Sequence, residues 1–357
     1  MVSNNRGQKA GRIAAYASFI LSGCFIFSPL HRAQNILIAL IFALLTGIAI
    51  IYLIKPVFNK AVQSRPKTRW IYAILSALAV IISMFTSLML LTEVIKDVAY
   101  VASRGISLFY YIAISFAMLS VSFYLCFNSE KGIYRFCILS FIIFISLSTV
   151  ILSSFITTKS VIPDFLRISR KSFEGSALCG ILSGLYFSCD TCIFLYCFKE
   201  YFTLENGKTD TRSLLLGYEL SFGIIFIYNI TAALIFGSKL IKTLDDPDFA
   251  LVKLISGTDL TEIISTVRIF SFMIKSSLYL FCAAKALKLC FKKPDTVFLR
   301  LVLAEFIMIP TSVAVLCFFD RTLGYGEFQF LIYPAIILLS ALFILLYSQL
   351  QKTKMNR

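Results

Sequence analysis

Charged residues are scarce in this sequence: Asp, Glu, Lys and Arg together make up 15% of its 357 residues. Soluble globular domains carry about a quarter. Hydrophobic residues make up 59% of the chain, and its mean hydropathy is +0.85. The core of a soluble protein cannot absorb so much apolar surface, whereas a surface that faces lipid can. The composition therefore excludes a soluble domain and predicts an integral membrane protein.

Residues and motifs typical of catalysis are also lacking. Histidine occurs once, at His31, and the HxxxD, HExxH, GxSxG and P-loop patterns do not occur. Asp190 has no acid or base companion at a useful spacing. We therefore predict that the chain is not an enzyme and that it uses no cofactor.

The ten cysteines lie almost entirely inside apolar runs, where thiols behave as small hydrophobic groups. Cys189 and Cys192 form a CxxC pair, but no second ligand pair accompanies them. Packing is therefore favoured over a zinc or redox role, and no metal site is predicted.

The apolar residues fall into runs close to the roughly 20 residues that cross about 30 Å of hydrocarbon as a helix. The ten approximate runs are 10–30, 34–54, 70–91, 107–127, 134–156, 176–198, 214–236, 263–289, 297–319 and 328–350. Lipid offers the backbone no hydrogen bonds, so each run is expected to be a helix. The first run follows basic residues as a signal peptide would, but no A-x-A-like site follows it. The sequence therefore predicts an all-α polytopic protein with one transmembrane domain, 1–357.

Lys and Arg are concentrated in alternate connections, most sharply at 55–69 and 285–300. Such a bias marks the cytoplasmic side, so both termini are predicted to be cytoplasmic. The net charge of +15 is explained by this bias and by anionic headgroups rather than by nucleic-acid binding. The external loop 237–262 is acidic around an apolar stretch, 249–255, which predicts an amphipathic helix at the outer surface. It is either a surface cap or a gating or partner contact.

Charged side chains inside spans are costly and need a reason. The five that stand out are Asp190, Glu219, Arg268, Lys275 and Glu305. Lys275 lies about 12 residues from either end of its helix, too deep for easy snorkelling. It must pair with an acid, bond to freed carbonyls or face a watery cavity, and Asp190 is the first candidate, with Glu93 second. The pair is either a static packing element or part of ligand or ion coupling.

Small residues interrupt two of the predicted helices. The first contains Ser22, Gly23 and Cys24 and then Ser28-Pro29, and the sixth contains Gly180, Ser183 and Gly184 and then Ser188-Cys189-Asp190. Such residues let a helix unwind and present backbone groups to a ligand, although close helix packing would also explain them. The two helices begin the five-helix halves 1–156 and 176–350. Helix count and break position therefore predict a 5+5 inverted repeat of the LeuT-like (APC) type, with helices one and six broken.

Several segments occur in an order that is similar to a known family. They are RIFSFMIKSSLYL at 268–280, LGY at 216–218, FAL at 249–251 and SFEG at 172–175. In these segments, and in length and helix count, the chain resembles the B subunits of nutrient germinant receptors of endospore-forming bacteria, the GerAB-type spore germination proteins. That family belongs to the amino acid/polyamine/organocation permease superfamily. Where it usually carries Gly-Glu in its sixth helix, this chain has Cys189-Asp190.

The resemblance implies a permease-like subunit in the spore inner membrane that binds a small nutrient, such as an amino acid, at mid-membrane. It also implies A-type and C-type receptor subunits as partners. The residues expected at the ligand are Ser22, Gly23, Cys24, Ser183, Gly184, Asp190, Lys275 and Tyr279. An amino acid or cation transporter of the same fold is the alternative, and a structural membrane subunit without a ligand is the second alternative.

Overall fold

The computed structural model of the protein describes residues 2–26, 30, 33–63, 108–127, 129–157, 170–204, 209–243, 250–251 and 261–290. Its named helices are α1 Val2–Ile26, α2 Ile36–Gln63, α4 Leu108–Phe127, α5 Ser129–Thr157, α6 Arg170–Ser188, α7 Thr191–Cys197, α8 Lys199–Phe202, α9 Thr211–Thr243 and α11 Thr261–Cys290. Within these residues the only β pairing is an isolated bridge between Thr203 and Thr209. The predicted all-α class is therefore confirmed for the described part of the chain.

Several of these helices are suited to a membrane. Four are long and apolar enough to cross one, over Ile36–Lys55, Glu130–Thr149, Phe173–Leu195 and Thr211–Gly237. The predicted spans 70–91, 297–319 and 328–350 lie outside the described residues, as do Glu93, Glu305 and most of the loop 237–262. The chain is thus a helical membrane protein, and the count of ten spans stays a prediction.

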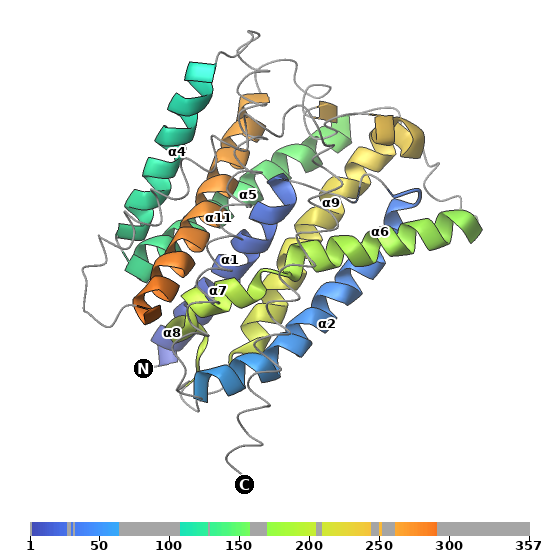
Figure 1. Ribbon diagram of the computed structural model, residues 1–357. Coiled ribbons are helices and arrows are strands. Elements are labelled where there is room, and N and C mark those ends of the chain that lie inside the picture. The colour runs from blue at the N-terminus through green and yellow to red at the C-terminus, as the bar shows by residue number, and fades with distance from the viewer. Residues whose placement is uncertain are drawn as a thin grey trace.

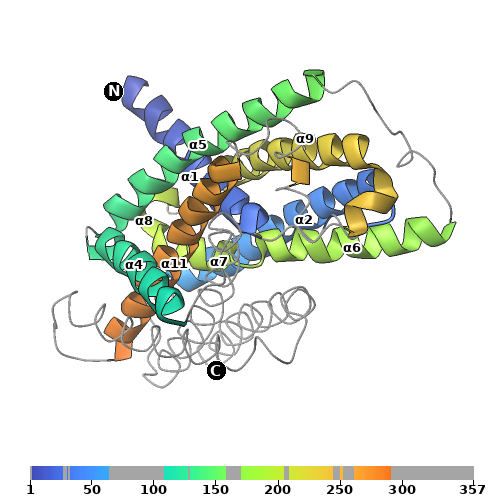
Figure 2. The same ribbon diagram turned by 90° about the horizontal axis from the view of Figure 1, so that it is seen from above.

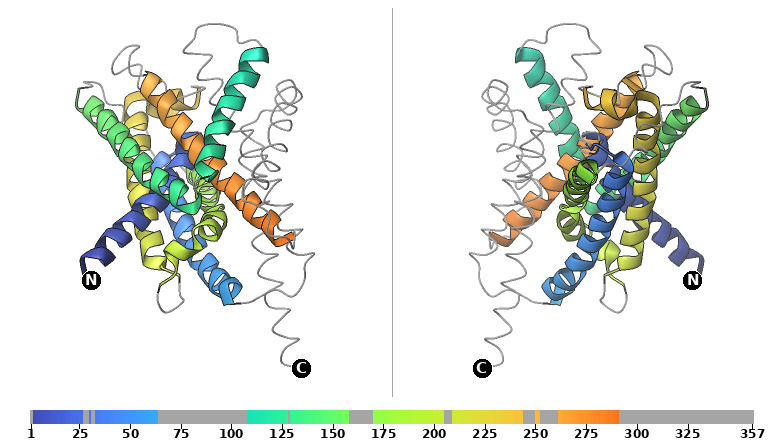
Figure 3. Two further views of the ribbon diagram at one scale, coloured as in Figure 1. Left: turned by 90° about the vertical axis from the view of Figure 1, so that its left-hand side faces the viewer. Right: turned by 90° about the vertical axis from the view of Figure 1, so that its right-hand side faces the viewer.

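Helix α1 occupies the centre of the bundle and packs against α5, α9 and α11 (Figures 1 and 2). On one side of it α2 and α6 run side by side. On the other side α4 packs against α11 at the edge of the bundle, and these two helices cross at an angle (Figure 3). The central position of α1 explains why its apolar residues show no single stripe.

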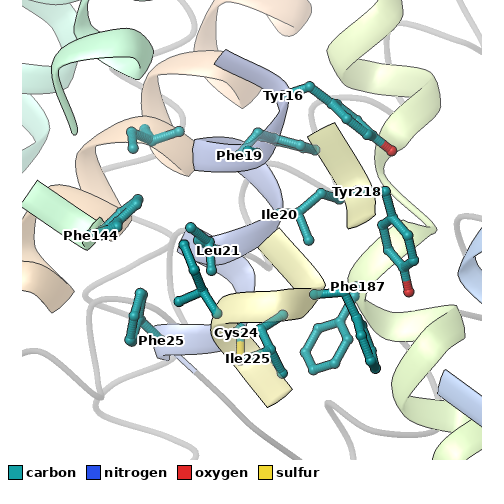
Figure 4. Close-up of a cluster of buried hydrophobic side chains, with 14 of the residues drawn as sticks. Tyr16, Phe19, Ile20, Leu21, Cys24, Phe25, Phe144, Phe187, Tyr218 and Ile225 are labelled. Carbon is teal, nitrogen blue, oxygen red and sulfur yellow. The ribbon is translucent and has the colours of Figure 1, made fainter. Parts of the chain in front are cut away.

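The side chains of the second half of α1 are enclosed in every direction. Every residue from Ala15 to Phe25 is buried. Figure 4 shows Phe144 of α5 on one side of α1, with Phe187 of α6 and Tyr218 of α9 on the other. Because α1 is surrounded by protein, polar atoms on it meet other side chains rather than lipid.

The glycines of α6 serve close packing against α2. A Cβ atom at Gly180 or Gly184 would collide with the backbone carbonyl oxygens of Ala39 or Ala43. Small residues one turn apart allow two membrane helices to approach this closely. The helix continues to Ser188, and the Ser183 hydroxyl donates to the carbonyl of Cys179 at 2.7 Å. The expected unwinding at Ser183 and Gly184 is therefore wrong.

The first helix is also unbroken at Ser22–Cys24, where a break was expected, whereas Ser28 and Pro29 lie outside the described residues. Ser22, Gly23 and Cys24 lie within α1, and the Ser22 hydroxyl donates to the carbonyl of Phe19 at 2.7 Å. The serine thus satisfies its polar group within its own helix instead of opening the backbone. Helix α9, which corresponds to the seventh predicted span, bends at Gly237, which has a φ of 71°, and continues to Thr243. Its predicted end at residue 236 falls at this kink.

Candidate ligand site at the break in the sixth span

The sixth span is interrupted at Cys189 and Asp190. Helix α6 ends at Ser188 and α7 begins at Thr191, with a turn between them. The Cys189 N–H donates to the carbonyl of Leu185 at 2.8 Å, so α6 ends with a regular helical hydrogen bond. Asp190 occupies the cap position of α7, but its side chain makes no capping hydrogen bond. Its carboxylate is turned to other helices instead.

That carboxylate binds two side chains of α11. The Lys275 Nζ atom lies 2.5 Å from Asp190 Oδ2, and the Tyr279 hydroxyl donates to the same oxygen at 2.7 Å. Lys275 and Tyr279 are four residues apart, so they project from one face of the helix. Asp190 is 1% exposed and Lys275 is 4% exposed. The predicted pairing of Lys275 with Asp190 is therefore confirmed, and it is a buried pair.

Helix α1 supplies the third side of this arrangement. The Lys275 Nζ atom lies 3.6 Å from the centroid of the Phe19 ring, a cation–π contact. One turn further along α1, a Cβ atom at Gly23 would stand only 3.4 Å from the same nitrogen. The absence of a side chain at Gly23 therefore lets the ammonium group lie against the helix.

A second polar contact joins α1 to the start of α7. The Tyr16 hydroxyl and the Thr191 hydroxyl are 2.8 Å apart and hydrogen-bonded. The rings of Tyr16 and Phe19 also pack on Phe194, with centroids 5.1 and 4.9 Å away. The backbone immediately after the break is thus attached to α1 by a hydrogen bond and by aromatic packing.

We use the term central site for the residues around the Lys275 ammonium group: Phe19, Gly23, Asp190, Lys275 and Tyr279. The sequence singled out all of them except Phe19, and it did not single out Tyr16 or Thr191 beside them. Aromatic residues at helical spacing in an apolar run are ordinary core residues, so nothing marked these.

Four of the eight predicted ligand residues do not converge here. Ser22 bonds to its own helix, and Cys24 lies in the hydrophobic core. Ser183 bonds to its own helix, while Gly184 faces α2. The ligand-binding roles of Gly23, Asp190, Lys275 and Tyr279 remain predictions. In the described ranges, no group of three or more His, Cys, Asp or Glu side chains could hold a metal ion.

A second ion pair, which we call the peripheral pair, lies where α9 begins. The Arg12 Nη1 atom of α1 donates to Asp210 Oδ2 at 2.9 Å. The Ser213 hydroxyl donates to the same oxygen at 2.7 Å, and the Ser213 N–H donates to Oδ1 at 3.2 Å. Burial raises the pKa of the Asp210 carboxyl, but the hydrogen bonds from Ser213 and Arg12 outweigh it, so the pKa lies below its ordinary value of 3.8. The pair fastens α1 to the first turn of α9.

Comparison with known proteins gives a match in structure. No family model matches the sequence, and no curated protein matches it either. Two mutants of a manganese transporter from Eremococcus coleocola superpose with a TM-score of 0.51 each, at 12% and 13% sequence identity. Each superposition covers 95% of this chain and 75% of the transporter. The chain has a membrane transporter fold. This fold is of the LeuT-like type, and the matched structures are transporters rather than enzymes.

Proposed function

We propose that this chain is the permease-like, GerAB-type subunit of a spore germinant receptor. It binds a small nutrient, an amino acid, at the central site and triggers germination together with A-type and C-type subunits. The observation that carries the proposal is the buried Lys275–Asp190 pair at the break in the sixth span. The transporter fold and the sequence resemblance support it. Its setting is the spore inner membrane, with ten spans in two inverted halves, 1–156 and 176–350, and both termini in the cytoplasm.

The chemistry of the central site fits a zwitterion. An amino acid carries the same two charges as the pair, so it can enter between them without leaving either charge unbalanced. Its ammonium group replaces that of Lys275 at Asp190, and its carboxylate replaces that of Asp190 at Lys275 and Tyr279. Charged hydrogen bonds are thereby exchanged rather than lost, which matters because an unpaired buried charge is costly. The resemblance to the permease superfamily implies that the Lys275 ammonium group stands where sodium-coupled members of that superfamily hold a cation.

Sensing requires that the nutrient bind one conformation more tightly than another. The structure holds α1, α7 and α11 together through the Lys275 ammonium group, the Phe19 ring and the Tyr16–Thr191 hydrogen bond. A nutrient that separates Lys275 from Asp190 removes the ion pair that joins the start of α7 to α11. Its binding energy then favours a state in which these helices are repositioned, and the partner subunits read that state.

A transporter of the same fold is the second candidate, since the superposed structures are those of a manganese transporter. A metal ion that approaches Asp190 meets the Lys275 ammonium group on the same oxygen, so it must displace a cation that is covalently tied to the site. That repulsion favours a zwitterion over a divalent cation. A purely structural subunit is the third candidate. The unbroken helix over Ser22–Cys24 agrees with it, whereas packing alone does not require a charged residue at the break in the sixth span.

The test is germination of spores that lack the gene, scored against a panel of single amino acids and other nutrients. We expect the response to one nutrient to be lost. Wild-type protein and a Ser183→Ala variant should restore it, because Ser183 bonds to its own helix. A paired Lys275→Met/Asp190→Leu variant should reach the membrane and fail to restore it. An unchanged response to every nutrient overturns the receptor role, and uptake of labelled amino acid or Mn²⁺ by the purified chain in proteoliposomes identifies a transporter.

A further inference from the structure

Helix α9 presents a charged side chain on a surface that otherwise suits lipid. Its exposed residues between Arg212 and Ile230 are Leu216, Glu219, Leu220, Gly223, Phe226 and Ile227, which recur at the spacing of one helix face. We call this set the outer face of α9. On α2 and α5 the exposed residues of the middle turns are uncharged, for example Leu45 and Ile142. Only Glu219 places an acid in such a position among the described residues, since Glu174 stands at the very start of its span.

Glu219 lies well inside the span. The apolar stretch begins at Thr211, so eight residues, about 12 Å of helix, separate Glu219 from its start. The described residues give Glu219 no hydrogen bond and no salt bridge. Arg212 is exposed on the same helix, but it is seven residues away, a rise of about 10 Å. A carboxylate exposed to hydrocarbon is unfavourable, so a partner outside this chain would stabilise it.

The surface beside Glu219 is shaped to admit another helix. Gly223 follows it by one turn, is exposed, and a Cβ atom there would meet nothing within 4 Å. A glycine in the middle of a membrane-facing surface lets a second backbone approach closely. The large apolar side chains of Leu220, Phe226 and Ile227 border this gap. The acid and the gap therefore lie together on one turn of the same face.

We propose that the outer face of α9 is the docking surface for a transmembrane helix of a different protein, one that carries a Lys or Arg side chain level with Glu219. Charge complementarity selects this occupant. A second copy of this chain, related by a two-fold axis along the membrane normal, would bring the same face of both copies together. Glu219 would then oppose Glu219, and like charges repel. The proposal is independent of what the central site binds.

The test is photocrosslinking in the native membrane. A photoreactive p-benzoylphenylalanine replaces Gly223 in the full chain, where it has room. The matched control places it at Gly175, a glycine of α6 that is also exposed and also has nothing within 4 Å of a Cβ atom. We expect position 223, and not 175, to give an adduct with one membrane protein. Mass spectrometry should place the contact in a spanning helix that contains Lys or Arg.

The charge is tested separately. Glu219→Gln should lower the adduct yield by about 3- to 30-fold, the range expected for one polar contact between membrane helices. Replacing the partner's basic residue with Gln should give the same loss, and combining the two changes should add nothing. Glu174→Gln, at the end of α6, should leave the yield unchanged. Adducts with lipid only, adducts with a second copy of this chain, or a yield that ignores Glu219→Gln would each overturn the proposal, whatever the germination phenotype.

Discussion

The central pair, Lys275–Asp190, and the peripheral pair, Arg12–Asp210, have similar local sequences but different surroundings. Asp190 and Asp210 both immediately precede a helix that starts with threonine, at Thr191 and Thr211. Asp210 caps its helix, accepting hydrogen bonds from the backbone and hydroxyl of Ser213. Asp190 does not cap α7. Its carboxylate binds Lys275 and Tyr279 of α11 instead, and this difference supports the function that we propose for the central site.

The surroundings of the pairs differ as well. The side chains of Lys275 and Asp190 are 5% and 2% exposed, whereas those of Arg12 and Asp210 are 17% and 10% exposed. Charges within protein and lipid cannot be rehydrated when a partner is removed, but charges near water can. Removing one partner of the central pair should therefore destabilise the fold strongly. Removing one partner of the peripheral pair should destabilise it only modestly.

The largest effect is expected from halving the central pair. Lys275→Met leaves the Asp190 carboxylate buried without its cation, and such a loss typically costs about 3 to 5 kcal/mol. Asp190→Leu added to Lys275→Met removes the second charge and should recover most of that stability. Thermal unfolding of the purified chain in lipid nanodiscs measures both. Equal unfolding temperatures for the single and paired variants would contradict the interpretation of the pair as a unit.

The next effect concerns the third member of the central site. Tyr279→Phe removes the hydroxyl that donates to Asp190 Oδ2 but keeps the ring. A hydrogen bond to a charged group contributes about 1.5 to 3 kcal/mol, so the unfolding temperature should fall clearly but less than for Lys275→Met. Tyr52→Phe is the matched control, because Tyr52 is 54% exposed on α2. If both variants unfolded at the same temperature, the Tyr279 hydrogen bond would contribute nothing to the stability of the fold.

The contrast between the pairs also shows what the sequence could predict. Lys275 lies so deep in its span that it needed an acid, freed carbonyls or a watery cavity, and few acids lie inside spans, so Asp190 could be named as the first candidate. Arg12 and Asp210 lie near span ends, where charges need no partner, and 198 residues separate them. Nothing in the sequence indicated that they meet.

The predicted breaks were half right for a similar reason. Small residues suggested unwinding at Ser22–Cys24 and at Ser183–Gly184, but glycine serves close packing as readily as it serves unwinding. In the structure, Gly184 allows α2 to pack closely against α6, and Gly23 leaves room for the Lys275 ammonium group beside α1. The sixth span does break at Cys189 and Asp190, within the last of the segments that suggested an interruption in the sequence. Sequence alone cannot separate these uses, because the neighbour that decides between them lies on another helix.

Removing the cap of the peripheral pair should have a smaller effect than either change at the central site. Asp210→Ala takes away the acceptor for the Ser213 N–H at the start of α9, and losing such a cap costs about 0.5 to 2 kcal/mol. Asp210→Asn keeps an acceptor for that N–H and should retain part of the stability. Unfolding of both variants in nanodiscs measures the difference. The cap would have no role if the alanine and asparagine variants were equally stable.

The smallest effect is expected from Arg12→Gln, a loss of about 0.2 to 1 kcal/mol of stability, because the pair is partly exposed and screened by salt.

The contribution of Asp210 to stability depends on pH in a definite direction. The pKa of Asp210 in the folded protein lies below 3.8, so the stability that Asp210 contributes is fully present above pH 3.8 and is lost as the pH falls through the folded pKa. The difference in unfolding temperature between the wild type and Asp210→Asn should therefore stay constant from neutral pH down to about pH 5 and shrink below pH 3.8. The paired Lys275→Met/Asp190→Leu variant keeps Asp210 and should show the same change with pH. A difference that grew on acidification would show that the carboxylate is destabilised in the fold, and it would remove the peripheral pair from the account of how α1 is fastened to α9.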